Sequence, residues 1–396
     1  MITLSSVRGW NDRGRRLSAL VGLALLGVVA ACGTSSTPTA KPSAAADASS
    51  CTSTTVLSAT CDITTPSAVT LTGAGANSIE PFFETVFYEY SQKDPKTTVT
   101  YSPAGSSVGV TDIQQATVDF GDSEIPMTSA QLAAATGGTI LQIPVDLGGV
   151  AISYNAAGVP ANLKLNGPTL AGIFDGTITN WDSPQIATVS GVSDLPNLPI
   201  KPVHRADASG PGYDLDQYLI DTSPAWVSAI ATSTSSRTWP LATVGVGEQL
   251  NTGVATYISQ TSGSIGFVEY GYALQNGFVN AALLNAAGSY VAPTEQSIAL
   301  AGAQATSVSA TDFNVVNEPG SGTYPIANFS WTLVYQKQAD TTTGIALGKL
   351  LDWVVTSGQQ DAEALGYAPL PANVASLAQT TIRELESSAG TPLFTS

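Results

Sequence analysis

Short β-branched apolar runs alternate along this chain with longer segments whose apolar residues recur at helical spacing. Between 79 and 92 the apolar positions are Ile79, Phe82, Phe83, Val86, Phe87 and Tyr90, which places them on one helix face. The predicted elements are, in order, a strand (68–72), a glycine-rich turn (73–76), a helix (79–92), a strand (97–101), a turn (105–107), a helix (108–116) and a strand (119–121). Repeated strand–turn–helix units predict an α/β fold with a parallel sheet covered by helices on both faces.

Two apolar segments, 148–154 and 324–335, are predicted to cross between two domains. The first domain would comprise residues 67–152 plus 324–385, with an amphipathic helical region at 344–365 returning to pack on it. The second domain, 153–323, would be inserted into the first. Two Rossmann-like α/β domains joined by a two-strand hinge enclose a cleft, and ligands of such sheets bind at the carboxyl ends of the strands.

The amino terminus has the pattern of an export signal. Arg8, Arg13, Arg15 and Arg16 precede a mostly apolar run, 17–31, which is too short to span a bilayer as a stable helix. Small residues then lead into Cys32, as in a bacterial lipobox. We therefore expect 1–31 to be a lipoprotein signal peptide and 32–66 to be a linker anchored by lipid at Cys32. An ordinary secretory signal and twin-arginine export through Arg15–Arg16 remain alternatives.

Charge narrows the class of partner. The formal net charge is −16, and cleavage after residue 31 would remove four arginines and one aspartate, which makes the mature chain more acidic still. Such a surface repels nucleic acid and anionic headgroups, so neither is expected as a partner. Membrane attachment is expected through the lipid anchor only, on the outer face of the cytoplasmic membrane.

Cysteine usage fits an exported chain. Apart from Cys32 there are only Cys51 and Cys61, whose spacing suggests a small disulfide loop, with two free buried thiols as the alternative. Two cysteines and the single histidine, His204, are too few ligands for a usual metal site. No metal and no cofactor are expected.

Three turns precede helical patterns and share one physical property. They lie at 75–78, 105–107 and 208–210. A helix amino terminus offers unpaired N–H groups and a partial positive charge, so each turn is either an ordinary helix cap or part of an anion site. Beside the third turn stands Arg205, whose guanidinium suits an oxyanion, with Asp207 close enough to orient it. A surface salt bridge is the alternative interpretation of that pair.

These residues lie within a wider resemblance that runs from about residue 70 to 372. The matching motifs are at 71–76, 105–107, 118–121, 169–176, 178–181, 205–210, 263–270, 324–326 and 364–371. On them the chain resembles the phosphate-binding lipoproteins of high-affinity phosphate ABC importers, the PstS type of type II periplasmic binding protein. The resemblance implies a monomeric receptor that captures inorganic phosphate outside the cytoplasm and delivers it to the importer's permease subunits.

The resemblance also implies the residues that bind the anion. Its direct contacts fall on Ser106, Arg205, Ser209 and Gly210, with Asp207 holding Arg205. Asn77 and Ser78 would supply further donors. The family's carboxylate falls on Glu124, with Asp122 as a rival for that role. A carboxylate accepts the hydrogen of a protonated phosphate but meets sulfate with an unpaired charge, so it favours phosphate.

Three departures from the family pattern lie in the site. Glu124 replaces an aspartate, Asn77 and Ser78 replace a hydroxyl residue followed by phenylalanine, and Pro211 replaces a threonine. They leave open a receptor for another oxyanion or an organic phosphate, or a sensory or interaction protein that has lost transport. An enzyme is not expected, because a Ser–His–Asp hydrolase would need His204 as base beside the charge of Arg205.

Overall fold

A computed structural model of the chain describes Thr65 and residues 67–233, 238–306, 308–310 and 315–394. The proposed signal peptide, Cys32, the linker and the Cys51–Cys61 loop lie outside the described residues. Within the described part, no helix combines the length and the apolar character needed to cross a membrane. The described residues belong to one compact unit.

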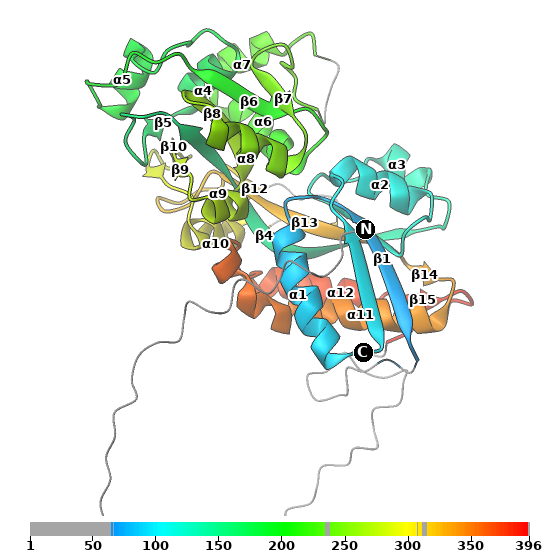
Figure 1. The fold of residues 1–396 in the computed structure, drawn as a ribbon. Helices are drawn as coiled ribbons and strands as arrows, with labels where there is room; N and C mark the ends of the chain where they lie inside the picture. Colours follow the sequence, from blue (N-terminus) through cyan, green and yellow to red (C-terminus); the bar gives the residue numbers. More distant parts are fainter. Residues whose placement is uncertain (1–64, 66, 234–237, 307, 311–314, 395–396) are drawn as a thin grey trace, which may run out of the picture. The chain divides into compact units, whose positions relative to one another are not determined.

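One large mixed sheet organises the fold. Its main path runs β2-β1-β3-β13-β4-β8-β6-β7, so it has two lobes joined by β13 and β4 (Figure 1). We call the part built on β1, β2 and β3 the first lobe and the part built on β6, β7 and β8 the second lobe. This arrangement confirms the α/β fold class with two crossing strands.

The chain enters the second lobe along one crossing strand and returns along the other. The elements up to the first crossing are β1 Val69–Gly75, α1 Glu80–Lys93, β2 Thr97–Ser102, α2 Ser106–Gln114, β3 Phe120–Ser123, α3 Ser129–Ala133 and β4 Ile140–Asn155. Those between the crossings are β5 Lys164–Leu165, α4 Gly167–Phe174, α5 Pro184–Ser190, β6 Lys201–Arg205, α6 Gly210–Thr222, α7 Pro224–Ala229, β7 Val246–Glu248, α8 Leu250–Gln260, β8 Ser264–Glu269, α9 Tyr270–Asn276, β9 Val279–Asn280, β10 Ala282–Leu284, β11 Tyr290–Val291, α10 Glu295–Gln304 and β12 Val315–Val316. The return comprises β13 Ile326–Tyr335, β14 Lys337–Gln338, α11 Thr341–Val355, the 3₁₀ turns Ser357–Asp361 and Glu363–Leu365, α12 Ala372–Ile382 and β15 Glu386–Ser387.

The sheet is parallel within each lobe but not at the crossing. β1 pairs in parallel with β2 and β3, and β6 pairs in parallel with β7 and β8. β13 is antiparallel to both β3 and β4, and β4 is antiparallel to β8. The predicted parallel arrangement therefore holds within each lobe, and the pairing is antiparallel at the crossing, because one strand carries the chain out and the other carries it back.

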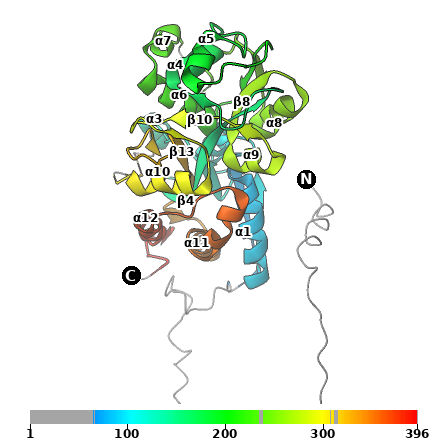
Figure 2. The same ribbon diagram turned by 90° about the vertical axis from the view of Figure 1, so that its left-hand side faces the viewer.

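Apolar residues cover both faces of the first lobe's sheet. Val334 belongs to the main core together with Phe82 and Phe83 of α1, whereas its neighbour Leu333 packs with Val110 and Ile113 of α2. Successive strand residues point to opposite faces, so α2 lies on one face while α1 lies on the other. Figure 2 shows α1, α11 and α12 gathered below the crossing strands.

Two turns differ from the sequence prediction. The first strand continues through Gly75, where a turn over 73–76 was expected, and α2 begins at Ser106 rather than at residue 108. At Gly75 a Cβ atom would lie 2.2 Å from the backbone oxygen of Asp122, and φ is +154°. Glycine thus lets β1 run on against β3 instead of marking a turn.

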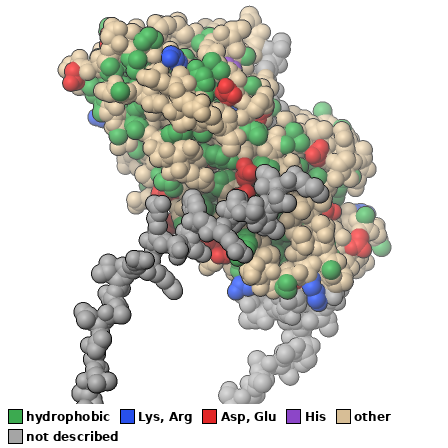
Figure 3. Space-filling view, in the orientation of Figure 1, with side chains coloured by type: hydrophobic (Ala, Val, Ile, Leu, Met, Phe, Trp, Pro, Cys, Tyr) green, Lys and Arg blue, Asp and Glu red, His purple; other side chains and the backbone are tan. Residues whose placement is uncertain are grey.

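Charged side chains are sparse on the face shown in Figure 3, and the acidic ones are scattered among uncharged polar and apolar groups. Many of the described carboxyl groups are instead buried. Asp122, Asp146, Asp214 and Glu269 are all at most 5% exposed.

Candidate ligand-binding site

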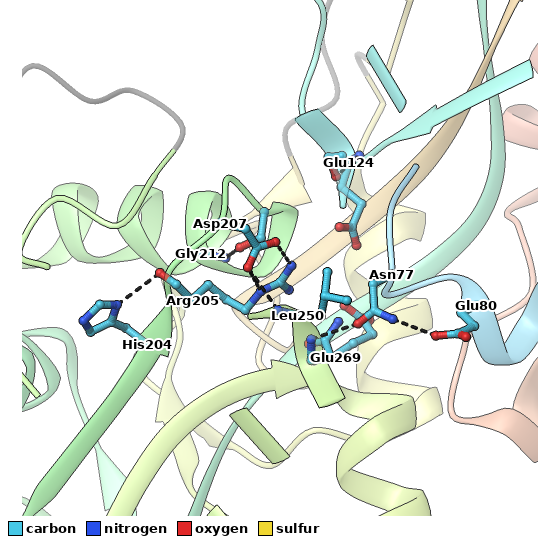
Figure 4. A network of polar contacts seen from close by, with 12 residues as sticks. Asn77, Glu80, Glu124, His204, Arg205, Asp207, Gly212, Leu250 and Glu269 are labelled. Atoms are coloured by element: carbon cyan, nitrogen blue, oxygen red, sulfur yellow. Dashed lines mark hydrogen bonds and ion pairs between the residues drawn. The ribbon is translucent and has the colours of Figure 1, made fainter. Parts of the chain in front are cut away.

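Arg205 ends β6 with its guanidinium already aligned. It is 2% exposed. Its Nε donates to Asp207 Oδ1 at 2.8 Å, and its second terminal nitrogen is paired with Asp207 Oδ2 (Figure 4). Asp207 Oδ1 also accepts from the Leu250 N–H at 3.0 Å, at the start of α8. Three contacts on the same carboxylate fix both Asp207 and the arginine that it holds, as the sequence indicated for this pair.

Helix α6 begins beside this arginine. Ser209 is its N-cap, and the Ser209 hydroxyl accepts from Gly212 N at 3.2 Å. Gly210 is the first helical residue, and Pro211 sits in the first turn, where the missing proline N–H has no helical partner to lose. The 13-residue helix therefore directs its amino terminus toward the junction of the lobes.

The first lobe contributes a second helix amino terminus. Ser106 opens α2 after Gly105, and its hydroxyl accepts from the Glu124 N–H at 3.4 Å. A Cβ atom on Gly105 would lie 3.1 Å from Asp207 Oδ2. The start of α2 therefore lies against the Arg205–Asp207 pair of the other lobe.

Glu124 follows β3 and meets α6. A Cβ atom on Gly210 would lie 2.1 Å from Glu124 Oε2, so glycine is needed for this approach. Burial raises the pKa of Glu124 to about 7, although the charge of Arg205 and hydrogen bonding from Ser78 and Asn328 favour the ionised form. Figure 4 shows its carboxyl pointing toward the Arg205 and Asn77 side of the network. Its rival, Asp122, hydrogen-bonds instead to Thr332 Oγ1 at 3.3 Å.

Asn77 is committed to a polar network that joins the lobes. Its Nδ2 donates to Glu80 Oε2 at 2.7 Å and to the Tyr272 hydroxyl at 2.9 Å, while its Oδ1 accepts from Asn251 N at 2.8 Å. Both amide hydrogens therefore have partners. The structure places this side chain in contacts between α9, α8 and the turn after β1, whereas the sequence suggested a donor for ligand.

Four further buried polar residues lie near Glu124 and were not among the predicted site residues. Asp146 lies on β4, Asp214 on α6, Glu269 on β8 and Asn328 on β13. Burial raises the pKa of Asp146 to about 8, and burial also raises the pKa values of Asp214 and Glu269 well above their ordinary range. The available signal was an isolated acid or amide inside an otherwise apolar strand, as at Asp146 and Asn328.

No metal site emerges within the described residues, where no group of three or more His, Cys, Asp or Glu side chains is arranged to hold an ion. His204 is buried, with Nδ1 3.1 Å from the Arg205 carbonyl oxygen and its ring stacked on Trp239 at 6.1 Å between centroids. These contacts are those of a packed core side chain.

The sequence matches the PBP superfamily domain over residues 44–357. It is 37% identical over 309 residues to the phosphate-binding protein PstS of Xylella fastidiosa (strain Temecula1), an alignment that covers 77% of this chain and 83% of the relative. It is 35% identical to the Pasteurella multocida protein of the same name, over 83% of this chain and 95% of the relative.

Solved structures agree on the fold. A phosphate-binding protein from Stenotrophomonas maltophilia superposes with a TM-score of 0.61 at 18% identity, covering 79% of this chain and 94% of that one. The high-affinity periplasmic phosphate-binding protein PfluDING gives a TM-score of 0.63 at 19% identity, covering 79% and 93%. The chain therefore belongs to the PBP superfamily and, within it, to the family of PstS phosphate-binding proteins.

Proposed function

We propose that this protein captures inorganic phosphate between its two lobes and delivers it to the permease of an ABC importer. The observation that carries the proposal is the convergence of Arg205, the amino termini of α6 and α2, and the Glu124 carboxyl at one junction. The relatives named phosphate-binding protein PstS support the same ligand.

Each residue has a distinct part in holding the anion. Arg205, kept in place by Asp207, supplies the positive charge and a planar pair of donors that match two phosphate oxygens. The backbone N–H groups at Gly210 and the hydroxyls of Ser209 and Ser106 add donors at two helix amino termini. Ser78 supplies a further hydroxyl from the turn after β1. Such donors replace the water that a small anion loses when the lobes close.

Glu124 is the acceptor in a site otherwise made of donors. A phosphate ion that keeps a proton at neutral pH can donate it to this carboxylate, whereas sulfate has no proton to give. Sulfate would leave two negative groups in contact within a buried site, and that penalty sets the preference. Glu124 is one methylene longer than the aspartate usual in the family, and its close approach to Gly210 is consistent with that extra reach.

The protein's place in the cell follows from the same proposal. Signal cleavage before Cys32 and lipidation of that residue would tether a monomeric receptor outside the cytoplasm, on the outer face of the membrane. The receptor performs no covalent chemistry. Closure of the lobes around phosphate supplies both its affinity and the shape that the permease recognises.

Calorimetric titration tests the proposal directly. A purified chain beginning near Ser50, stripped of bound anion, is titrated with phosphate and, separately, with sulfate. We expect phosphate to bind at micromolar or lower concentration and sulfate to bind far more weakly. Absence of phosphate binding would overturn the proposal and direct the search to other oxyanions.

A further inference from the structure

Asn328 occupies a central place among the buried acids. It lies on β13, one of the two crossing strands, is 3% exposed, and pairs in register with Gly148 of β4. Its Nδ2 donates to Glu124 Oε1 at 2.9 Å and lies 3.5 Å from Glu269 Oε2. A single amide nitrogen thus bridges a carboxyl of the first lobe and a carboxyl at the end of β8.

The far side of this bridge is firmly anchored. Glu269 Oε1 accepts from Gly149 N at 2.7 Å, and the Glu269 N–H donates to Asn251 Oδ1 at 3.0 Å. A Cβ atom on Gly148 would lie 2.2 Å from Glu269 Oε1 and 2.9 Å from Asn328 Oδ1. The bare backbone of Gly148 makes the room in which both side chains sit.

The bridge matters because Glu124 lies among other buried carboxyl groups. The ionisable groups that act on it or face it are the acids Asp122 on β3, Asp146 on β4, Asp214 on α6 and Glu269 on β8, the tyrosines Tyr101 on β2 and Tyr367, and the cation Arg205 on β6. Burial alone drives the Glu124 carboxyl toward its neutral form. The Ser78 hydroxyl, the charge of Arg205, the Asn328 amide and the Gly210 N–H favour the ionised form instead.

We propose that Asn328 is a specificity-determining positioning residue: its amide holds Oε1 of Glu124, which leaves Oε2 to accept the hydrogen of a protonated oxyanion. The inference rests on the proposed function and extends it. Discrimination against an unprotonated oxyanion then depends on a residue that need not touch the ligand.

The direction of the effect follows from the charge states. Without the Asn328 donor, the pKa of Glu124 rises above its value of about 7, so a larger fraction of the carboxyl is protonated at neutral pH. A protonated carboxyl can donate to sulfate instead of repelling it. Loss of Asn328 should therefore strengthen sulfate binding, whereas simple loss of structure would weaken every ligand.

The experiment measures sulfate and phosphate affinity from about pH 5.5 to about pH 8.5 for the unaltered protein and for Asn328→Leu. Sulfate does not titrate in this range, so the pH dependence of its affinity reports protein groups alone. In the unaltered protein we expect sulfate affinity to fall as pH rises through about 7. In Asn328→Leu that fall should move up by about one pH unit, and the phosphate-to-sulfate preference at neutral pH should drop about tenfold.

Asn285→Leu is the matched control. Asn285 is also buried, and its Nδ2 donates to the Gly320 and Thr323 carbonyl oxygens at 2.8 Å and 2.9 Å, away from the site. The Asn285→Leu substitution should lower the unfolding temperature without changing the pH dependence of sulfate affinity. If Asn328→Leu does not fold, Asn328→Ala serves in its place, since it removes the donor without adding a titratable group and should shift the profile in the same direction.

Two results would overturn the inference. One is a sulfate profile in the folded Asn328 variant that superimposes on that of the unaltered protein. The other is an equal shift in Asn285→Leu. Failure of the unaltered protein to bind phosphate at all would instead contradict the proposed function, so the two failures are distinguishable.

Discussion

Arg205 and Glu124 face each other across the junction of the lobes, and they are supported in opposite ways. The side chain that holds Arg205 lies close by in sequence: Asp207 stands two residues on, just before the cap of α6. Glu124 depends on residues far along the chain, among them Asn328, 204 positions away. The comparison suggests that the positive half of the site is a local unit, while the carboxyl half is assembled by the fold.

Removing the positive half should have the largest effect. Arg205→Ala deletes the charge and leaves Asp207 without its partner, so we expect phosphate affinity to fall about 100-fold or more. Arg205→Lys keeps the charge but not the planar pair of donors, so its phosphate affinity should lie between those of the unaltered protein and Arg205→Ala. Titration calorimetry measures both variants. A loss of less than about threefold in Arg205→Ala would show that the local unit does not carry the anion.

The second largest effect is expected at the contact between Gly210 of α6 and Glu124. Gly210→Ala places a methyl group 2.1 Å from Glu124 Oε2, so one side must move, and phosphate affinity should drop about tenfold. Gly253→Ala in α8, whose nearest neighbour would be 3.3 Å away, is the control and should bind normally. Equal affinities for the two variants would mean that Glu124 and Gly210 are not in contact when ligand is bound.

The carboxyl half should also make stability depend on pH. Glu124 and Asp146 keep their protons in the folded chain up to about pH 7 and about pH 8, whereas the unfolded chain loses them near pH 4. The folded state then binds more protons, so stability should fall as pH rises from about 5 to about 7, by up to about 1.4 kcal/mol per pH unit per group.

Unfolding in urea at several pH values measures this slope. Asp146→Asn keeps an oxygen for the Ser330 N–H, now 3.2 Å from Asp146 Oδ1, and should flatten the slope. The exposed Asp194→Asn is the matched control and should not. Stability that increases over this interval would contradict the assignment of raised pKa values to the buried acids.

The smallest expected effect concerns the contacts that hold the lobes together. The Tyr272 hydroxyl lies 2.9 Å from both Asn77 Nδ2 and Glu80 Oε2. Tyr272→Phe removes these contacts, which tie α9 to the turn after β1, so phosphate affinity should weaken about fivefold.

Tyr218→Phe is the control for this variant. It removes a comparable bond to Leu284 O, at 2.7 Å, within the second lobe. It should reduce stability without reducing affinity. A similar loss of affinity in both variants would show that Tyr272 acts through general stability rather than through closure of the lobes.

The sequence predicts the local, positively charged half of the site better than the carboxyl half. The Arg205–Asp207 pair, the Ser209 cap and the Pro211 position could be predicted, because residues a few positions apart interact within one turn. The crossing strands were predicted from their apolar runs, and both are present as β4 and β13.

The acids around Glu124 could not be predicted, since Asp146, Asp214 and Glu269 meet only after β4, α6 and β8 have packed. The hydrogen bond from Asn77 to the Tyr272 hydroxyl likewise could not be predicted, because the two residues are 195 positions apart. The antiparallel crossing was missed because local periodicity does not reveal strand direction.

Gly148 couples the residue types that positions 269 and 328 can accept. Its hydrogen occupies the place where a larger side chain would collide with Glu269 and Asn328. A relative with alanine at the equivalent of position 148 would need a shorter residue at 269 or a displaced one at 328. Substitutions at positions 148, 269 and 328 should therefore occur together among relatives. Relatives that differ in anion selectivity would then differ at these three positions while Arg205 is unchanged.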